Sequence, residues 1–556
     1  MRLLKKSLSI ALMMVLVLTT LLAGCGGDNK TPATNADKST PPATSNANNE
    51  QPGASAWELG SEELEFSYYH HYGWYTMPNW GEDPASKWIL ENKKVKINAI
   101  SSGGDAEAKM STILISGELP DAIWMERGAE VEKLRSEGLL VPLDDYIEKY
   151  PNYKKWVMSL ENIDMLRSPD GKLYQIPNWY TSQPNGNTGY VVNKKIYETL
   201  GSPRLETTED LYSYLVAVKN RFPDVTPLEV GEGADGIEYM MSAFKENRSG
   251  VFYGSNYMAV PSDGKFVSLF TDPAYREGMQ FVSRLFREKL ISPDTFTQLK
   301  EEVDRKMLTG KVAVYITSSP TEMGSQGDME LKKQDPNDGY FMIWPIAKPG
   351  LDRNKIYTGD YKQLGWNVTV ITKAAKDPEK IFAFFDWLTG PEGQCTVMWG
   401  PRGIYWDGFT DDGWAKFTDA YANDPVGRDE MTSKTEPINW AGNTVFVDVS
   451  KAQYESTLPV EKQNWQTRFQ REITWKTQQN TTEFININPA SDSDEGIIRL
   501  TISDIYDQAR ASAIQTAKSD AEVISILDEA EKQAQAAGYQ VLLDYMTARW
   551  QENINK

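Results

Sequence analysis

The sequence has few of the side chains on which metal sites and many catalytic centres depend. Its 556 residues include only two histidines, His70 and His71, and two cysteines, Cys25 and Cys395. Zinc and copper sites use groups of histidine and cysteine ligands, so no metal site of that kind and no cofactor are expected. A Ser-His-Asp triad would have to use one of the two adjacent histidines. These shortages argue against several classes of enzyme.

Positive charge is also in deficit. The chain carries 58 Lys and Arg against 78 Asp and Glu, a formal net charge of −20. A surface of this sign repels phosphate backbones and anionic lipid headgroups, so nucleic acid is not expected as a partner. Aromatic side chains, by contrast, are abundant, with 17 Trp and 27 Tyr. Most of them are expected in a core, but a flat apolar face beside a polar atom also suits sugars.

A secretion signal precedes the folded part. Three basic residues are followed by an apolar run that is too short for a membrane span and ends in Leu22-Ala23-Gly24-Cys25. This order resembles the lipobox of bacterial lipoproteins, which implies diacylglycerol on the Cys25 thiol and anchoring at the outer face of the cytoplasmic membrane. An ordinary signal peptide with a chance cysteine is the alternative. The next 30 or so residues lack aromatic side chains and are predicted to form a disordered tether.

Alternating strand and helix patterns begin at residue 64. Strands are predicted at 64–70, 95–101 and 121–125, with helices at 84–91 and 105–116 between them. This β-α-β-α-β order is typical of a mostly parallel sheet. Ligands of such sheets bind at the carboxyl ends of the strands, which here lie near His71–Trp74 and Glu126–Arg127.

A second unit follows, because the chain is too long for one core. It begins with a strand expected at 190–193, and later strands along the chain are expected at 311–317, 341–346 and 366–372. Its expected helices are 207–222, which opens with a capping box, 272–289 and 377–390, followed by C-terminal helices at 519–537 and 541–550.

Several short segments, in order along the chain, resemble signatures of family 1 extracellular solute-binding proteins. They are SGELPD at 116–121, GLLVPLDDY at 138–146, DGKLYQIP at 170–177, NKK at 193–195 with the helix from Thr207, GKVA at 310–313, and the stretch from Ile371 to Leu388. Each segment is weak by itself, and their common order carries the resemblance. Length, lipobox and C-terminal helix are most similar to the long oligosaccharide-binding lipoproteins of this family.

The resemblance implies an α/β, two-lobe periplasmic-binding-protein-like fold (type II), with mixed sheets flanked by helices, hinge crossings and a helical C-terminal region. The expected divisions are a signal peptide at 1–24, the lipidated cysteine and tether at 25–56, lobe 1 at 57–182 and lobe 2 at 183–308. Residues 309–372 are expected to return to lobe 1 through the hinge, and 373–556 to complete lobe 2 and the C-terminal helices. Some relatives carry a calcium loop after the helix matching 211–222, but Asn220–Val225 lacks alternating oxygen ligands, so no calcium is expected there.

Candidate ligand-binding residues were sought where strands end or lobes cross. They are His71, Trp74, Tyr75, Glu126, Arg127, Asn178, Trp179, Tyr180, Asp360, Trp366, Arg402, Tyr405 and Trp406. Rings would stack on apolar sugar faces, and charged and amide groups would pair with hydroxyls. For each aromatic, core packing is the alternative. For Glu126 and Arg127 the alternative is a surface ion pair.

The expected function is capture of an oligosaccharide for an ABC importer, whose membrane permease subunits recognise the closed form. The protein is expected to be a monomer that touches the membrane only through its lipid anchor, and not to be an enzyme. A binder of peptides or another polar nutrient is the alternative. A surface glycosidase or polysaccharide lyase is least favoured, because nothing singles out a carboxylate pair such as Asp360 and Glu126.

Overall fold

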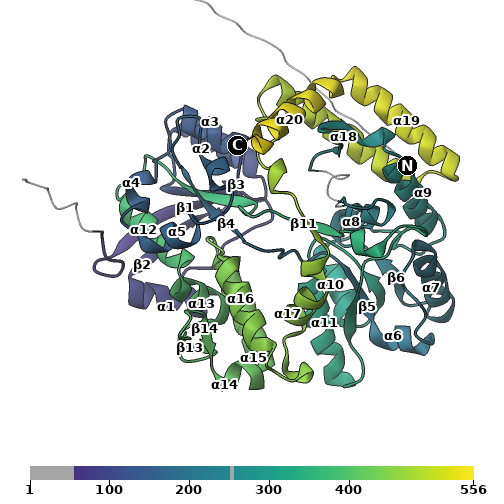
Figure 1. Cartoon of the computed structure of the whole chain (residues 1–556), viewed down its shortest axis with the longest axis horizontal. Coiled ribbons are helices and arrows are strands. Elements are labelled where there is room, and N and C mark those ends of the chain that lie inside the picture. The colour runs from purple at the N-terminus through teal and green to yellow at the C-terminus, as the bar shows by residue number, and fades with distance from the viewer. Residues whose placement is uncertain (1–55, 249, 251–255, 556) are drawn as a thin grey trace, which may run out of the picture. The chain divides into compact units, whose positions relative to one another are not determined.

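The computed structural model describes residues 56–248, 250 and 256–555 (Figure 1). The predicted signal peptide, Cys25 and nearly all of the predicted tether lie outside the described residues. Among those that are described, no helix combines the length and the apolar character that crossing a bilayer requires.

The first sheet contains the strands that were predicted near the N-terminus. It has the order β2-β1-β3-β12-β4, formed by β1 (Leu64–His70), β2 (Val95–Ile100), β3 (Ala122–Glu126), β4 (Gln175–Asn178) and β12 (Asn367–Ile371). Strand β1 runs parallel to β2 and β3, whereas β12 runs antiparallel to β3 and β4. The predictions at 64–70, 95–101, 121–125 and 366–372 are confirmed, but β4 was not predicted.

Helices cover both faces of this sheet because its strands alternate two apolar sets of side chains. Tyr68 and Trp124 point into a core shared with α1 (Pro84–Lys93), α12 (Pro378–Thr389) and α13 (Pro391–Trp399). Tyr69 and Ile123 point to the other face, against α2 (Ala106–Ser116) and α3 (Ala129–Ser136). Helix α2 ends where predicted, since Gly117 adopts a left-handed φ of 70°.

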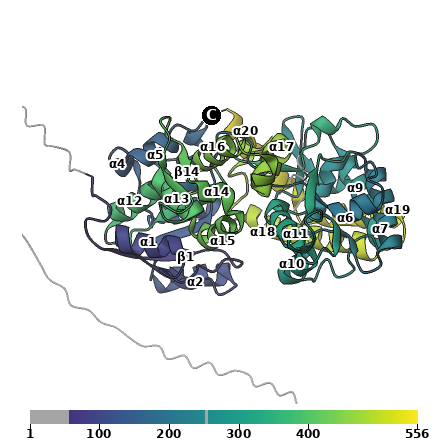
Figure 2. The same ribbon diagram turned by 90° about the horizontal axis from the view of Figure 1, so that it is seen from below.

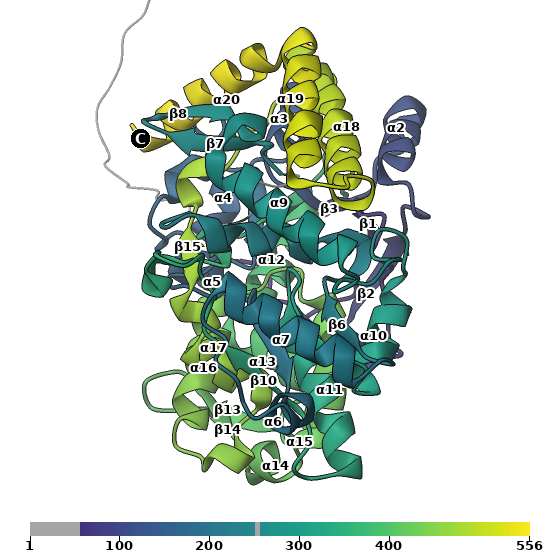
Figure 3. The ribbon, with the colours of Figure 1, turned by 90° about the vertical axis from the view of Figure 1, so that its right-hand side faces the viewer.

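The second sheet has the order β10-β5-β9-β6, from β5 (Tyr190–Asn193), β6 (Thr226–Glu229), β9 (Val312–Tyr315) and β10 (Tyr340–Ile343). One of its cores includes α7 (Thr208–Arg221) and α9 (Pro273–Arg287), together with α18 (Asp494–Gln515), α19 (Asp520–Ala536) and α20 (Tyr539–Ile554). The other core includes α10 (Lys300–Leu308), α11 (Pro320–Gln334) and α17 (Trp465–Glu472). Figure 2 shows α10 and α11 close together, and Figure 3 shows α18 and α19 alongside α9.

The sheets divide the chain differently from the expected boundaries. Strands β9 and β10, within 309–372, belong to the second sheet, not the first. Helices α12, α13 and α16 (Thr444–Glu455), within 373–556, pack on the first sheet. The reason is β12, which inserts between β3 and β4 and so brings the helices that follow it onto the first sheet. Two linking segments, β11 (Gly359–Tyr361) and β15 (Gln478–Asn480), pair in parallel.

Candidate functional site

Aromatic rings gather at the carboxyl ends of β1 and β3. Tyr72, Trp74 and Tyr75 follow β1, Trp124 lies near the end of β3, and Trp366 precedes β12. Ring centroids lie 4.7 Å apart for Tyr72 and Trp124, 4.9 Å for Tyr75 and Trp124, and 5.6 Å for Tyr72 and Trp366. Trp74 is 68% exposed and lies 5.2 Å from Tyr72. A large exposed indole beside a buried aromatic cluster offers a ligand a flat apolar surface.

The loop after β1 can hold these rings in place because Gly73 lies against another backbone segment. A Cβ atom at this position would come within 2.8 Å of the Gly104 carbonyl oxygen. The loop is tied down further at Ser102, whose hydroxyl donates to the Tyr72 carbonyl at 2.8 Å. Glycine is therefore needed for the close approach that places Tyr72 and Trp74 at the edge of the sheet.

Polar atoms without a partner surround the cluster. Both ring nitrogens of His70, the Tyr72 hydroxyl and the amide nitrogens of Asn178 and Asn367 are buried and form no hydrogen bond within the described part of the chain. The two amide oxygens are used, since Asn367 accepts from Trp124 Nε1 at 2.8 Å and Asn178 accepts from the Gly442 amide at 2.5 Å. Buried polar groups are nearly always paired, so these unpaired atoms indicate a place for bound water or a ligand.

Strand register explains why these polar residues meet. Asn367 of β12 lies opposite Glu126 of β3 on one side and opposite Asn178 of β4 on the other. The three side chains therefore form one row across the sheet, at the carboxyl ends of β3 and β4. Of this row, the sequence analysis named Glu126 and Asn178 but not Asn367.

The two histidines lie on opposite faces of the sheet. His70 is 1% exposed, and its ring lies 5.0 Å from Tyr75 and 5.6 Å from Trp440. Burial lowers the pKa of His70 to about 3, so the ring is neutral at physiological pH. His71 points toward α2 instead, where Nδ1 lies 3.1 Å from the Tyr69 hydroxyl and Nε2 lies 3.3 Å from Glu107. The structure thus brings His70, and not the candidate His71, to the aromatic cluster.

Charged side chains lie beside the same edge. Glu126 is solvent-accessible, yet the protein around it displaces enough water to raise its pKa to about 7, against the opposing effect of Arg127 and Lys362. Burial lowers the pKa of Arg127 to about 10, and its Nη1 donates to the Leu364 carbonyl at 3.0 Å. Lys362 pairs with Asp360 at 2.9 Å. Two carboxylates and two cations therefore lie near one another.

Four candidates lie apart from these groups or within the core. Arg402 is exposed and pairs with Asp407 at 2.9 Å. Tyr405 is buried and donates to Asp424 at 2.9 Å, and Trp406 donates to the Gly400 carbonyl at 2.7 Å. Tyr180 is fully buried in the same core. The polar atoms of these residues are already hydrogen-bonded or their rings are enclosed by the core. Their role in ligand binding therefore stays a prediction that this geometry does not favour.

Trp179 is the remaining candidate. It is half-buried and adopts a left-handed φ of 58°, a conformation that non-glycine residues seldom take. A Cβ at Gly442 would meet its ring at 3.0 Å. Trp179 thus lies beside the segment that holds Asn178, and its role stays a prediction.

Four members of this group were not predicted from the sequence, namely Tyr72, Trp124, Asn367 and Lys362, and of the two adjacent histidines His71 was chosen instead of His70. Period-two alternation along β1 and β3 would have placed His70 and Trp124 on one face, opposite His71. No local signal connects Asn367 to Glu126, because β12 lies more than 200 residues after β3 in the chain.

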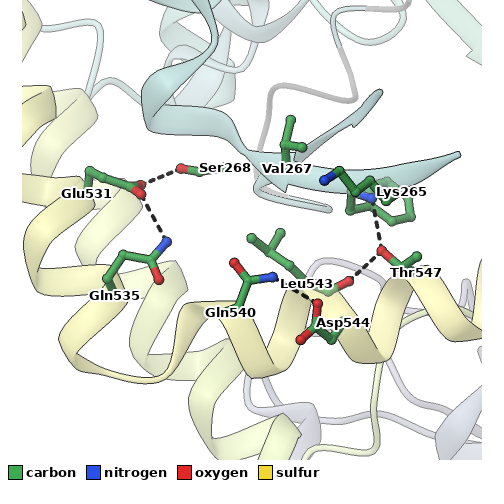
Figure 4. A pocket seen from close by; sticks show the side chains of 10 residues that line it. Lys265, Val267, Ser268, Glu531, Gln535, Gln540, Leu543, Asp544 and Thr547 are labelled. Atoms are coloured by element: carbon green, nitrogen blue, oxygen red, sulfur yellow. Dashed lines mark hydrogen bonds between the residues drawn. The ribbon is translucent and has the colours of Figure 1, made fainter. Parts of the chain in front are cut away.

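A surface cavity of about 340 Å³ lies apart from this cluster and is formed by β8 (Lys265–Ser268), α19 and α20 (Figure 4). Its polar groups already bond to one another: Glu531 accepts from Ser268 and Gln535, and Asp544 accepts from Gln540. The two carboxylates of this cavity are therefore already engaged. Within the described ranges, no group of three or more His, Cys, Asp or Glu residues is placed to hold a metal ion.

Comparison with known proteins gives a family and a fold. The model of the bacterial extracellular solute-binding protein family matches residues 77–394, more than half of the chain. The fructooligosaccharide ABC transporter substrate-binding protein FusA of Streptococcus pneumoniae is 28% identical over 347 residues, 58% of this chain and 61% of the relative. The polygalacturonan/rhamnogalacturonan-binding protein YtcQ of Bacillus subtilis is 22% identical over 318 residues, 54% of this chain and 59% of the relative. The matches thus span about 60% of the length of these curated relatives.

Solved structures resemble the chain over most of its length. The alginate-binding protein AlgQ2, crystallised without calcium ion, has a TM-score of 0.70 and 18% identity, covering 89% of this chain and 100% of that protein. FusA of S. pneumoniae in complex with kestose has a TM-score of 0.65 and 20% identity, with the same coverage. The fold is therefore that of the two-lobe solute-binding proteins.

Proposed function

This chain belongs to the bacterial extracellular solute-binding protein family, and on that premise we propose that it captures an oligosaccharide and delivers it to the permease of an ABC importer. One observation carries the proposal: exposed Trp74 and half-buried Trp366 adjoin buried polar atoms that have no partner in the described part of the chain. Sugars present this combination of an apolar face and a ring of hydroxyls. The names of relatives that bind fructooligosaccharide and polygalacturonan support the same class of ligand.

Each group has a part in this proposal. Trp74 and Trp366 stack on sugar faces, while Asn178 and Asn367 donate amide hydrogens to hydroxyl oxygens. His70 is neutral, so one ring nitrogen donates and the other accepts, which suits a hydroxyl. Enclosure strengthens these hydrogen bonds by excluding water. An affinity of about 1 μM, or about −8 kcal/mol, would hold the ligand and still allow release to the permease.

Binding without catalysis is part of the proposal. A glycosidase needs two carboxyl groups free to act as acid and as base or nucleophile. Asp360 is instead bound by Lys362 at 2.9 Å and by the Thr481 hydroxyl at 2.6 Å. In this pair, which nothing in the sequence singles out, Glu126 therefore lacks a second free carboxyl group.

A thermal-shift panel of neutral and acidic oligosaccharides tests the proposal. A ligand at 100 times its Kd adds about 2.7 kcal/mol to the free energy of unfolding, which raises the melting temperature measurably. We expect a shift with one linkage class and no product on long incubation. Absence of a shift across the panel would contradict saccharide binding, and slow product formation would contradict a purely binding role.

We further propose that Cys25 carries the lipid that holds the protein at the outer face of the membrane. Cells fed an alkyne fatty acid should label the wild-type protein, and Cys25→Ser should lose the label and leave the membrane fraction. Cys395→Ser is the matched control, because that thiol is buried in the fold. Retained label in Cys25→Ser would contradict the anchor.

A further inference from the structure

We propose that the site selects neutral oligosaccharides over those built from uronic acids, an inference that rests on the proposed function. The basis is the balance of charge around the aromatic cluster. Of the two cations near the cluster, Lys362 is paired with Asp360 and Arg127 lies next to Glu126, and Glu436 adds one more carboxyl group.

The balance begins at the end of β3. Glu126 makes no hydrogen bond or ion pair that would occupy its carboxylate within the described chain, although the charges of Arg127 and Lys362 act on it. Burial raises the pKa of Tyr72 and Tyr257, and the charge of Glu126 adds to this effect in both. Lys362 is in turn held by Asp360 at 2.9 Å. Arg127 and Lys362 on one side and Glu126 and Asp360 on the other thus sum to zero net charge among these four side chains.

A second free carboxyl lies on the far side of the aromatic rings. Glu436 follows α15 (Pro425–Thr435) and directly precedes Pro437, whose carbonyl accepts from the Tyr75 hydroxyl at 2.7 Å. Burial, and then the charge of Glu322 on α11, raise the pKa of Glu436 to about 7. The cation that acts on it, Lys451, is already bound to Asp448 at 3.0 Å and to Gln470 at 3.2 Å. Glu436 therefore makes this side of the cluster negative.

Neutral sugars fit this arrangement. Hydroxyl groups donate to the free oxygens of Glu126 and Glu436, and they accept from Arg127 and the amides of Asn178 and Asn367. A uronate would instead place another negative charge near carboxylates in a partly desolvated site, where repulsion is stronger than in water. The same sugar skeleton should therefore bind more weakly when it carries carboxylates.

Isothermal titration at pH 8 with matched saccharide pairs provides the test. Each pair has the same linkage, one member neutral and the other charged: methyl-esterified and free tetragalacturonate, and xylotetraose with and without a methylglucuronate substituent, with kestose as a further neutral probe. We expect at least one neutral probe to bind, and its charged partner to bind at least 10-fold more weakly. Equal or tighter binding of a charged partner overturns the selectivity, whereas no binding by any saccharide overturns the proposed function itself.

Two variants test which charges are responsible. Glu126→Gln should keep the affinity for the neutral probe within about threefold, since an amide still bonds to hydroxyls, and should reduce the neutral-to-charged ratio. Glu436→Gln should do the same. Glu118→Gln is the matched control, because Glu118 is an exposed carboxylate before β3, at the opposite end of that strand, and should leave the ratio unchanged. An unchanged ratio in both site variants overturns the inference.

Discussion

His70 is a residue whose placement makes sense only if something binds beside it. Both of its ring nitrogens are buried without a hydrogen-bond partner among the described residues, which costs stability that an apolar ring would not cost. Its neighbours Tyr75, Trp124 and Trp440 form an aromatic environment in which phenylalanine would fit chemically. A stability cost retained at the edge of a ligand site is typical of function.

We therefore expect His70→Phe to separate stability from binding. The free energy of unfolding should stay the same or rise by about 1 kcal/mol, because two desolvated nitrogens are removed. Saccharide affinity should fall about 10-fold, equivalent to about 1.4 kcal/mol. Denaturant titration and calorimetry measure the two quantities. A loss of stability with unchanged affinity would show that His70 serves the core alone.

Among the elements, α7 shows how much a local signal can specify. Its capping box forms as predicted: Thr207 Oγ1 accepts from the Asp210 amide at 3.1 Å, and Asp210 accepts from the Thr207 amide at 3.0 Å. The helix packs on the second sheet and contributes nothing to the aromatic cluster. We therefore expect the capping box to contribute to the stability of the fold and not to ligand binding.

Thr207→Ala should lower the free energy of unfolding by about 1 kcal/mol, because one amide at the helix start loses its acceptor. Saccharide affinity should not change. Thr207→Ser is the matched control, since it keeps the hydroxyl and should restore most of the loss. Denaturant melts of the three proteins measure this effect, and equal midpoints would mean that water replaces the cap without cost.

For the whole molecule, the distribution of charge predicts an unusual dependence of stability on pH. Burial raises the pKa of Glu126 and Glu436 from 4.5 to about 7 and also raises that of Asp386 and Glu455. Folded carboxyls of this kind bind protons before the unfolded chain does, so stability rises as pH falls from about 7 toward 4.5. The net charge of −20 also shrinks over this range, which relieves repulsion.

His70 acts in the opposite direction. Burial lowers the pKa of His70 from 6.5 to about 3 in the folded protein. Its contribution to the free energy of unfolding is therefore fully present above pH 6.5 and is lost as the pH falls below that value. We expect the buried carboxyl groups to outweigh His70 in this pH range. The melting temperature of the wild-type protein should therefore be higher at pH 5.5 than at pH 8. In the double variant that carries both Glu126→Gln and Glu436→Gln, the difference between the two melting temperatures should be smaller. A melting temperature that is higher at the alkaline pH would contradict the assignment of these two carboxyls.

The local elements follow from short stretches of the sequence. Short apolar segments predicted β1, β2 and β3, Gly117 predicted the end of α2 and a capping box predicted the start of α7, because these signals lie within a few residues of one another. Ligand sites at strand ends follow from the same reasoning, which is why Trp74, Tyr75 and Glu126 were predicted at the edge of the sheet where the aromatic cluster lies. Tyr405 and Trp406 show its limit, since composition cannot tell a core aromatic from an exposed one.

The way in which these elements assemble depends on contacts between strands that are distant in the chain. Strand β12 enters the first sheet between β3 and β4, which no periodicity in the chain records. That insertion aligns Glu126, Asn367 and Asn178, brings Trp366 to Tyr72, and carries α12 and α13 onto the first sheet rather than the second. Hydrogen bonding between distant strands is set by the fit of whole surfaces, so the local pattern predicted the strands and the packing of the complete fold made the site.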